Sequence, residues 1–435
     1  MKKQLHLLTY LVALLLPSIL WAQSYPKLSI TETKPTTKYY HQSTAEVEAR
    51  KTYQIQPTLP FTGLSFRADL GVAWTDMYVI VNQDTFRVQP EEHETEDLPY
   101  SQSTLLVFDQ PFQEFILYTG EVKGKLTVSL FNAQAHKIPQ PALRQERFTE
   151  DDLLCEKPTL ITQEEWRAGL PLPTYQRATT QVNHVIIHHS ATFNSLTDYE
   201  NVVRNIYLFH TQDRGWSDIG YNFLVAPDGT LFEGRSAGGQ NVAGDNIRGA
   251  HFCGRNSGTM GVCLLGNYNT AVPTDTALAT IVRVTSWKLN KEDLDPLATN
   301  SHPTNSNLGV IAGHRNGCAT ECPGENLYAR LEFIRISTEE QLAKECREEP
   351  EEPEEPQVFN IYPVPNDGTL TVSLPQPDST VHLDIIDLQG RTLSLPVVIE
   401  DEDQFIVQTQ LLPAGSYILQ ITTSQEVLTR KILIE

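Results

Sequence analysis

Three residues in the middle of the chain could together bind a transition metal. His188 ends the nearly continuous apolar run 182–188, His314 follows a second apolar run, and Cys322 lies eight residues further on. Two imidazoles and a thiolate are the ligand set of an open catalytic zinc site, in which water takes the fourth position. The spacing leaves other interpretations open, because a histidine after a strand is often structural and an exported cysteine is often a disulfide partner.

The elements that must position these residues follow from the pattern between Cys155 and Cys346. Strand signals alternate there with helix signals, which predicts a mixed sheet flanked by helices. The runs 182–188 and 308–311 are expected to be buried strands, and helices are expected from Thr197 and over 275–289. Cys322-Pro323 precedes a further helix-like stretch with proline in its first turn, so the thiolate would lie near the positive end of a helix dipole.

The flanking segments are of another kind. Short strand-like runs separated by turn residues predict a small all-β domain over about 25–145 and a β-sandwich from Val358 onward. Between the central region and this sandwich, Arg347–Pro356 has proline every third residue with glutamates between, which is typical of an extended linker. The acidic run Glu91–Asp97 is expected to be a solvated loop rather than a cation site, and it is given no chemical role.

Composition narrows the classes of function. The 435 residues include 33 Lys+Arg and 54 Asp+Glu, a formal charge of −21, which disfavours nucleic acid as the main partner. Lys2 and Lys3, a short apolar core and a cleavage point after Ala22 predict a secretory signal peptide. That segment is too short and interrupted to span a bilayer comfortably, and no other apolar run approaches 18 residues, so no transmembrane helix is expected in the mature chain.

Six blocks of the central region, in order, resemble the peptidoglycan recognition proteins and the related zinc amidases, including a phage lysozyme. The resemblance covers nearly all of residues 155–346. The blocks are Val185-Ile-Ile-His-His-Ser-Ala-Thr192, Gly215-Trp-Ser-Asp-Ile-Gly-Tyr-Asn-Phe-Leu-Val225, Asp228-Gly-Thr-Leu-Phe-Glu-Gly-Arg235, Gly249-Ala-His251, Gly261-Val-Cys-Leu-Leu-Gly266 and Gly313-His-Arg315 with Cys322-Pro-Gly324.

This resemblance implies a zinc-dependent N-acetylmuramoyl-L-alanine amidase, which cuts the amide bond between the lactyl group of muramic acid and the first L-alanine of the stem peptide. Peptidoglycan or its muropeptides would be the substrate. His189 matches a supporting position that is not a ligand. The loop between Arg235 and Gly249 is longer than the family pattern, which leaves open the preferred residue at the third position of the stem peptide. Carried over by position, the site consists of the Zn²⁺ ligands His188, His314 and Cys322, the catalytic residues Tyr221 and Thr320, and the substrate-binding residues Trp216, His251 and Asn256.

Two other classes of function stay open. Members of this family that only bind the cell wall typically lack the cysteine ligand, so Cys322 favours an enzyme over a non-catalytic surface receptor. The third possibility is an adhesin or scaffold in which the β-domains act and the amidase fold is vestigial.

The six cysteines all lie in the central region. With Cys322 reserved for zinc, five remain, so at least one thiol is unpaired, and Cys263 in its apolar run is the natural buried one. The expected pairs are Cys155 with Cys346 and Cys253 with Cys318.

The C-terminal segment resembles the sorting domains of proteins exported by the type IX system, which direct passage through the outer membrane and are commonly removed or exchanged for a surface anchor. The matching blocks include Asn360-Ile-Tyr-Pro-Val-Pro-Asn366 and Leu412-Pro-Ala-Gly-Ser-Tyr417. An ordinary accessory β-sandwich is the alternative. A secreted or cell-surface location, reached through the periplasm and outer membrane with the export machinery as partner, is therefore expected. The predicted organisation is a signal peptide (1–22), an N-terminal β-domain of unknown role (23–148), the amidase domain (149–346), an acidic linker (347–357) and a sorting β-sandwich (358–435).

Overall fold

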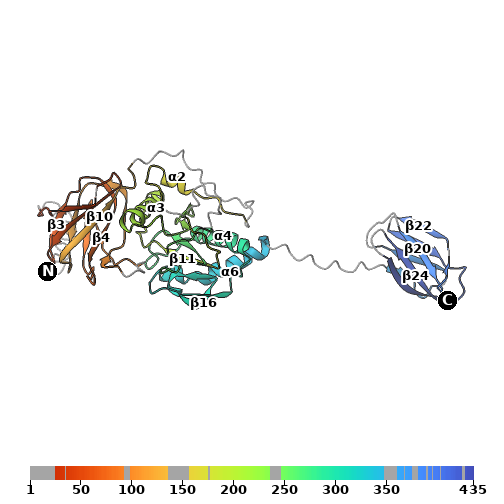
Figure 1. Cartoon of the computed structure of the whole chain (residues 1–435). Coiled ribbons are helices and arrows are strands. Elements are labelled where there is room, and N and C mark those ends of the chain that lie inside the picture. The colour runs from red at the N-terminus through yellow and green to blue at the C-terminus, as the bar shows by residue number, and fades with distance from the viewer. Residues whose placement is uncertain are drawn as a thin grey trace, which may run out of the picture. The chain divides into compact units, whose positions relative to one another are not determined.

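The computed structural model forms two compact units, residues 1–347 and 348–435 (Figure 1). The predicted signal peptide and the whole of the predicted linker lie outside the described residues. Among the residues described, no helix is long and apolar enough to cross a membrane. The structure describes residues 25–34, 36–92, 98–135, 156–174, 177–235, 246–346, 360–366, 368–374, 381–387, 390–393, 395–401, 403–423 and 427–435.

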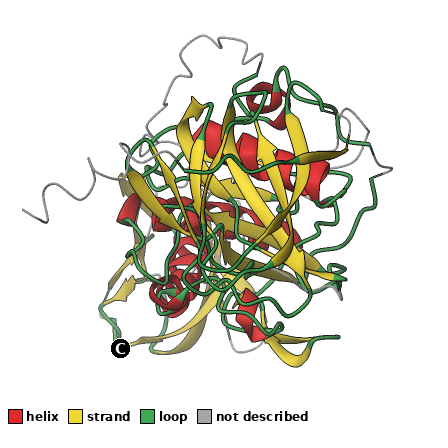
Figure 2. Cartoon of the chain, turned by 90° about the vertical axis from the view of Figure 1, so that its left-hand side faces the viewer, coloured by secondary structure: helices red, strands yellow, loops and turns green. Residues whose placement is uncertain are grey.

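The first unit begins with a β-sandwich over residues 25–135, here called the first β-domain. Strands, yellow in Figure 2, dominate this unit, and helices are few. The two sheets of the first β-domain enclose one apolar core, to which β4 contributes Leu64 and Phe66 and β9 contributes Phe115. One sheet has the order β1-β2-β10-β4-β7 with β8 also on β4, and the other has the order β3-β9-β5-β6. The strands are β1 (Thr31–Lys34), β2 (Tyr40–Val47), β3 (Thr52–Ile55), β4 (Phe61–Asp69), β5 (Tyr78–Val81), β6 (Asp84–Arg87), β7 (Tyr100–Gln102), β8 (Leu106–Phe112), β9 (Phe115–Tyr118) and β10 (Gly124–Phe131).

A mixed five-stranded sheet forms the centre of the same unit, with the order β13-β12-β14-β11-β17. Strand β11 runs parallel to both of its neighbours, β14 and β17, whereas β12 and β13 are antiparallel. Both faces of a parallel strand are normally covered, and every residue of β11 is buried. The strands are β11 (His184–His189), β12 (Phe223–Val225), β13 (Leu231–Glu233), β14 (Thr259–Leu264) and β17 (Ile311–Gly313), with a separate hairpin of β15 (Thr299–His302) and β16 (Asn305–Gly309).

Helices cover the two faces of the central sheet. Alternate residues of β11 point to opposite faces, so Val185 and Ile187 join an apolar cluster with α4 and α6, while α3 packs on the other face. The expected strand 308–311 is instead divided between β16 and β17. The helices are α2 (Gln163–Arg167), α3 (Tyr199–Leu208) continued by η1 (Phe209–Asp213), α4 (Asp275–Glu292), η3 (His314–Asn316), α5 (Glu325–Tyr328), and α6 (Leu331–Gln341) continued by η4 (Leu342–Cys346).

Two of the expected helix starts differ from the structure. The N-cap of α3 is Asp198, which accepts a hydrogen bond from the backbone N–H of Asn201, rather than Thr197. Thr197 instead donates to the carboxylate of Asp109 in the first β-domain, at 3.0 Å. Pro323 lies before α5, which begins at Glu325, and is not in its first turn.

The first β-domain and the central sheet share an interface on α3, which lies between them in Figure 1. Tyr40 and Phe131 of the first β-domain belong to the same apolar cluster as Val203 and Ile206 of α3. The fully buried Asp213 follows this helix and pairs with Arg67 of β4 at 2.8 Å. Asp213 also accepts hydrogen bonds from Tyr40 Oη at 2.8 Å and Ser129 Oγ at 2.6 Å. The two parts are therefore joined by an apolar core and by a buried ion pair.

Replacing Asp213 with alanine is expected to lower the free energy of unfolding by roughly 3 to 5 kcal/mol, because it leaves the Arg67 guanidinium without its buried partner. Urea unfolding of the full chain measures this. The control is Glu121→Ala, which removes an exposed pair with Arg50 and is expected to cost about 1 kcal/mol or less. Equal losses in both variants would contradict the structural role given to Asp213.

Acidification is also expected to destabilise this unit. His184 lies at the buried start of β11, and its Nδ1 is 3.0 Å from the carbonyl oxygen of Gly309. Burial lowers the pKa of His184 below its ordinary value of 6.5. Below about pH 6.5 the unfolded chain takes up a proton that the folded chain resists, so stability should fall as pH falls towards the lower folded pKa. The urea midpoint should fall less steeply with decreasing pH in His184→Gln than in the parent. Equal pH dependence of the two midpoints would contradict this role of His184.

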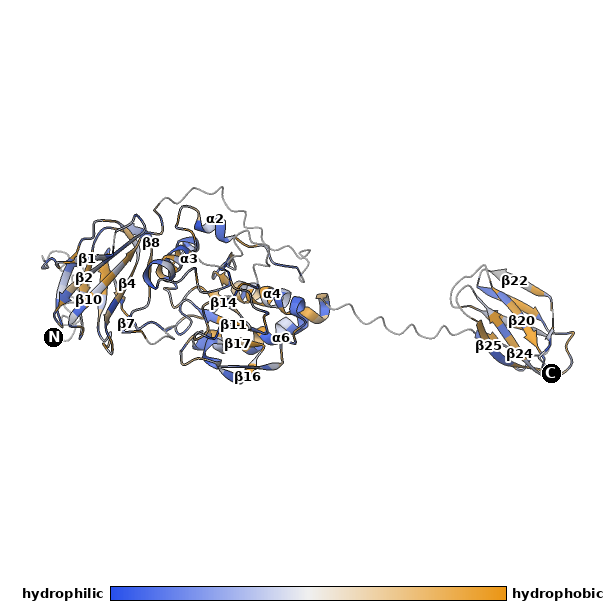
Figure 3. Cartoon of the chain, in the orientation of Figure 1, coloured by the Kyte–Doolittle hydropathy of each residue, from blue (hydrophilic) through white to orange (hydrophobic). Residues whose placement is uncertain are grey.

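The second unit is a β-sandwich of two four-stranded sheets, with the orders β18-β19-β23-β22 and β21-β20-β24-β25. Figure 3 shows hydrophobic and hydrophilic segments along its strands, and the inward residues Leu370, Phe405, Leu419 and Ile432 form its core. The strands are β18 (Asn360–Tyr362), β19 (Thr369–Ser373), β20 (His382–Ile386), β21 (Thr392–Leu393), β22 (Val397–Asp401), β23 (Gln404–Gln408), β24 (Gly415–Thr422) and β25 (Val427–Ile434).

Candidate metal centre

The structure brings His188, His314 and Cys322 together. His188 lies near the end of β11 and His314 directly follows β17, so the parallel pairing of these strands delivers both imidazoles to the same edge of the sheet. The ligand atoms of the three residues all lie within 4.8 Å of one another, and all three side chains are buried. His188 Nδ1 is 3.6 Å from Cys322 Sγ. This donor set of two nitrogens and one sulfur fits zinc.

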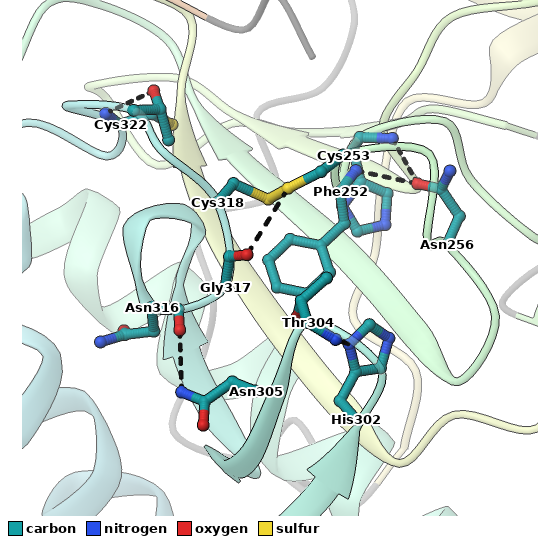
Figure 4. Close-up of a disulfide and its surroundings, with 12 residues drawn as sticks. Phe252, Cys253, Asn256, His302, Thr304, Asn305, Asn316, Gly317, Cys318 and Cys322 are labelled. Atoms are coloured by element: carbon teal, nitrogen blue, oxygen red, sulfur yellow. Dashed lines mark hydrogen bonds between the residues drawn. A yellow bond between two sulfur atoms is a disulfide. The ribbon is translucent and has the colours of Figure 1, made fainter. Parts of the chain in front are cut away.

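The sulfur of Cys322 is available to a metal, because Cys322 is a free cysteine. A neighbouring group of Cys253, His314 and Cys318 also has metal-ligand spacing. Its two sulfurs, however, form the Cys253–Cys318 disulfide, which ties the loop before β14 to the loop that carries Cys322 (Figure 4). This pairing was predicted and is confirmed, as is the free, buried state of Cys263. The pairing of Cys155 with Cys346 stays a prediction, since Cys155 lies outside the described residues.

His251 lies behind His188. His188 Nε2 and His251 Nδ1 are 2.9 Å apart, and His251 Nε2 is 3.3 Å from Thr259 Oγ1. Burial, with Arg235 adding to it, lowers the pKa of His251 to about 3, so its ring stays neutral and its Nδ1 can accept a hydrogen bond from His188 Nε2–H. That bond would leave His188 Nδ1, the nitrogen nearer the sulfur, to face a metal. In this position His251 supports a ligand.

Asn256 shapes the loop that carries His251. Its side-chain oxygen accepts hydrogen bonds from the backbone N–H groups of His251 at 2.7 Å and Phe252 at 2.9 Å (Figure 4). Asn256, which was predicted to contact substrate, therefore also has a structural role in this loop.

Tyr221, just before β12, is buried with its ring centroid 5.3 Å from that of His188. Its hydroxyl hydrogen-bonds the thiol of Cys263, and burial raises the pKa of both groups. Trp216 is half-buried one layer further out, with its ring 4.6 Å from that of His210, which in turn lies 5.9 Å from the Tyr221 ring. Tyr221 is thus beside the predicted ligands, whereas Trp216 is separated from them by other rings.

Thr320 lies two residues before the sulfur ligand Cys322 and is hydrogen-bonded to the first β-domain. Its hydroxyl accepts a hydrogen bond from the backbone N–H of Cys322 at 3.1 Å and donates to the backbone carbonyl of Glu92 at 2.6 Å. The Glu92 carboxylate in turn lies 2.8 Å from Nε2 of His189. The expected solvated loop is therefore wrong for Glu91 and Glu92, whose side chains are only 7% and 17% exposed. Residues 93–97 of that acidic run lie outside the described residues.

Comparison with known proteins places this site in a family. The model of the N-acetylmuramoyl-L-alanine amidase family matches residues 178–325, and that of the secretion system C-terminal sorting domain matches residues 360–435. The chain is 30% identical to peptidoglycan-recognition protein SC2 of Drosophila simulans over 175 residues, which are 40% of this chain and 84% of the relative. It is 28% identical to the N-acetylmuramoyl-L-alanine amidase of Homo sapiens over 216 residues, which are 47% of this chain and 34% of that protein. The solved structure of wild-type Drosophila PGRP-LB has 30% identity and a TM-score of 0.32, with 40% of this chain and 92% of that chain covered.

The chain therefore belongs to the family of peptidoglycan recognition proteins and N-acetylmuramoyl-L-alanine amidases. It also carries a type IX sorting domain at its C-terminal end, which implies secretion to the cell surface or outer membrane.

Proposed function

We propose that this protein is a secreted, zinc-dependent N-acetylmuramoyl-L-alanine amidase that hydrolyses the lactyl-L-alanine amide bond of peptidoglycan. The observation that carries the proposal is the buried cluster of His188, His314 and the free thiol of Cys322, whose ligand atoms lie within 4.8 Å of one another. A protein that only bound cell wall would have no need of a buried, free thiol beside two imidazoles.

His188, His314 and Cys322 would hold the zinc, with His251 fixing the ring of His188 from behind. Bound zinc would supply an acidified water and polarise the scissile carbonyl. Three protein ligands leave a fourth position for water or substrate, which distinguishes a catalytic from a structural zinc site.

Tyr221 is the residue that we assign to the reacting atoms. When water adds to the lactyl carbonyl, negative charge develops on its oxygen, and a tyrosine hydroxyl that keeps its proton at neutral pH can donate to it. The C–N bond then breaks, and the L-alanine nitrogen leaves with a proton as the amino terminus of the stem peptide. The ring of Tyr221 lies near the rings of His188 and His210, at centroid distances of 5.3 and 5.9 Å, and its hydroxyl would exchange its bond to Cys263 for one to the substrate oxygen.

Thr320 and Trp216 are assigned outer roles. Thr320 would support Cys322 through the hydrogen bond from the backbone N–H of that residue. Trp216 carries the Arg214 guanidinium over its ring at 5.7 Å and offers an aromatic surface to a muramyl peptide. The sorting domain accounts for export of the enzyme.

Product analysis tests the proposal. Full-length protein loaded with one equivalent of zinc is incubated with purified muropeptides, and the products are identified by mass spectrometry. The proposal predicts free stem peptides that begin with L-alanine, together with peptide-free muramyl saccharides. Binding of muropeptides without cleavage would favour the non-catalytic receptor, and products cut elsewhere in the stem peptide would exclude this bond as the target.

A further inference from the structure

Two glutamates of the first β-domain lie against the candidate metal centre, although they are far from it in the sequence. Glu91 and Glu92 follow β6 on the way to β7, and the backbone N–H of Glu91 donates to the carbonyl of Gln102 at 3.0 Å, which fixes this segment to the end of β7. Both side chains are largely buried. Burying carboxylates costs free energy unless they are paired, so their partners indicate what they do.

Glu92 contacts three separate segments of the central domain. Its carboxylate lies 2.8 Å from His189 Nε2 at the end of β11, and it accepts a longer hydrogen bond, of 3.4 Å, from Asn269 in the loop after β14. Its backbone carbonyl accepts a hydrogen bond from the hydroxyl of Thr320, in the loop before α5. Glu92 therefore joins the strand that carries His188 to the loop that carries Cys322.

Two of these partners, His189 and Thr320, are each joined to Cys322 by one hydrogen bond. The backbone N–H of His189 donates to Cys322 Sγ at 3.4 Å, and the backbone N–H of Cys322 donates to Thr320 Oγ1 at 3.1 Å. Outer partners of this kind orient metal ligands, and their loss typically weakens metal binding by about 10- to 100-fold.

The neighbour that supplies Glu92 is firmly attached. The first β-domain is joined to the central domain through the shared apolar cluster on α3 and the buried Arg67–Asp213 pair. Glu91 adds a second attachment beside the site, with its carboxylate 4.0 Å from the guanidinium of Arg214 and both side chains no more than 7% exposed. A positioning group on a rigid support holds its target better than one on a free loop.

We propose that Glu92 is a positioning residue of the metal centre, supplied by the first β-domain, which holds His189 and Thr320 and through them fixes Cys322 for zinc binding. This inference rests on the zinc site of the proposed function. It gives the first β-domain a role as an integral part of the amidase site. It also gives Thr320 a defined task, since its one hydroxyl proton is used on the Glu92 carbonyl.

The test measures zinc affinity of the full-length protein by competition with a chromophoric chelator. Glu92→Ala is expected to weaken zinc binding by about 10- to 100-fold, and Glu92→Gln, which keeps an oxygen acceptor for His189, should bind zinc more tightly than Glu92→Ala. Thr320→Val should also weaken binding. The double variant should lose less than the product of the two single losses, because both changes loosen the same contact. Glu121→Ala, in an exposed ion pair of the same domain, is the matched control.

Zinc affinity of Glu92→Ala within about twofold of that of Glu121→Ala would overturn the inference. So would cleavage by Glu92→Ala that is faster than cleavage by the parent, since that result would make the segment an obstruction of the site. The melting temperatures of the metal-free variants should match that of the metal-free parent, which separates loss of zinc from loss of fold. A parent that binds zinc tightly but cleaves no muropeptide would refute the proposed activity and leave the position of Glu92 to be decided by the competition assay.

Discussion

Replacing Cys322 with serine is expected to reduce zinc affinity by more than about 100-fold and to abolish amidase activity. The variant keeps two imidazoles but loses the only sulfur of the ligand cluster, and a serine hydroxyl keeps its proton at neutral pH. Losing a direct ligand should cost more than the 10- to 100-fold typical of an outer partner. Zinc content after exhaustive dialysis and release of stem peptides from muropeptides are the two measurements.

Cys263→Ala serves as the control for zinc retention. Among the residues that the structure describes, Cys263 is the other free, buried cysteine, and it is not one of the three residues with clustered ligand atoms. It should retain zinc, whereas Cys322→Ser should not. If Cys322→Ser kept a full equivalent of zinc and its activity, the metal would have to be held elsewhere, and the assignment of the ligands would be wrong.

Replacing Tyr221 with phenylalanine is expected to lower kcat by roughly 100- to 1000-fold while zinc content stays at one equivalent. The change removes only a hydroxyl from a ring that packs beside His188, so the metal ligands keep their neighbours. The expected loss is that of one donor to a developing oxyanion. If the hydroxyl acts only in the transition state, kcat and kcat/KM should fall by the same factor.

The thiol of Cys263 loses its hydroxyl partner in Tyr221→Phe, so melting temperatures of the parent and variant must be compared before the rates are interpreted. A stable variant with bound zinc and activity within about threefold of the parent would show that the Tyr221 hydroxyl takes no part in the reaction.

Much of the central domain could be predicted from the sequence, because the patterns that indicate its strands and helices are local. The run 182–188 has apolar residues in succession at Val185, Ile186 and Ile187, which is typical of a strand covered on both sides, and the structure has the buried strand β11 at 184–189. The ligand set was recognisable from ordered blocks that resemble a family, and parallel pairing of β11 with β17 explains why residues so far apart in the chain meet.

Contacts between domains could not be predicted in the same way. Thr320 and Glu92 are separated by 228 residues, and nothing in the acidic run of Glu92 differs from an ordinary solvated loop. The start of α3 was misplaced for the same reason, because Thr197 bonds Asp109 of the first β-domain and leaves the capping position to Asp198. Such side chains are fixed by docking of one domain on another, which no short-range pattern records.

X-ray absorption at the zinc edge of the zinc-loaded, full-length protein tests the central claim most directly. With His188, His314 and Cys322 as ligands and one position left for water, the spectrum should contain one sulfur neighbour at about 2.3 Å and about three nitrogen or oxygen neighbours near 2.0 to 2.1 Å. A zinc shell without sulfur, or one with several sulfurs, would contradict the proposed centre.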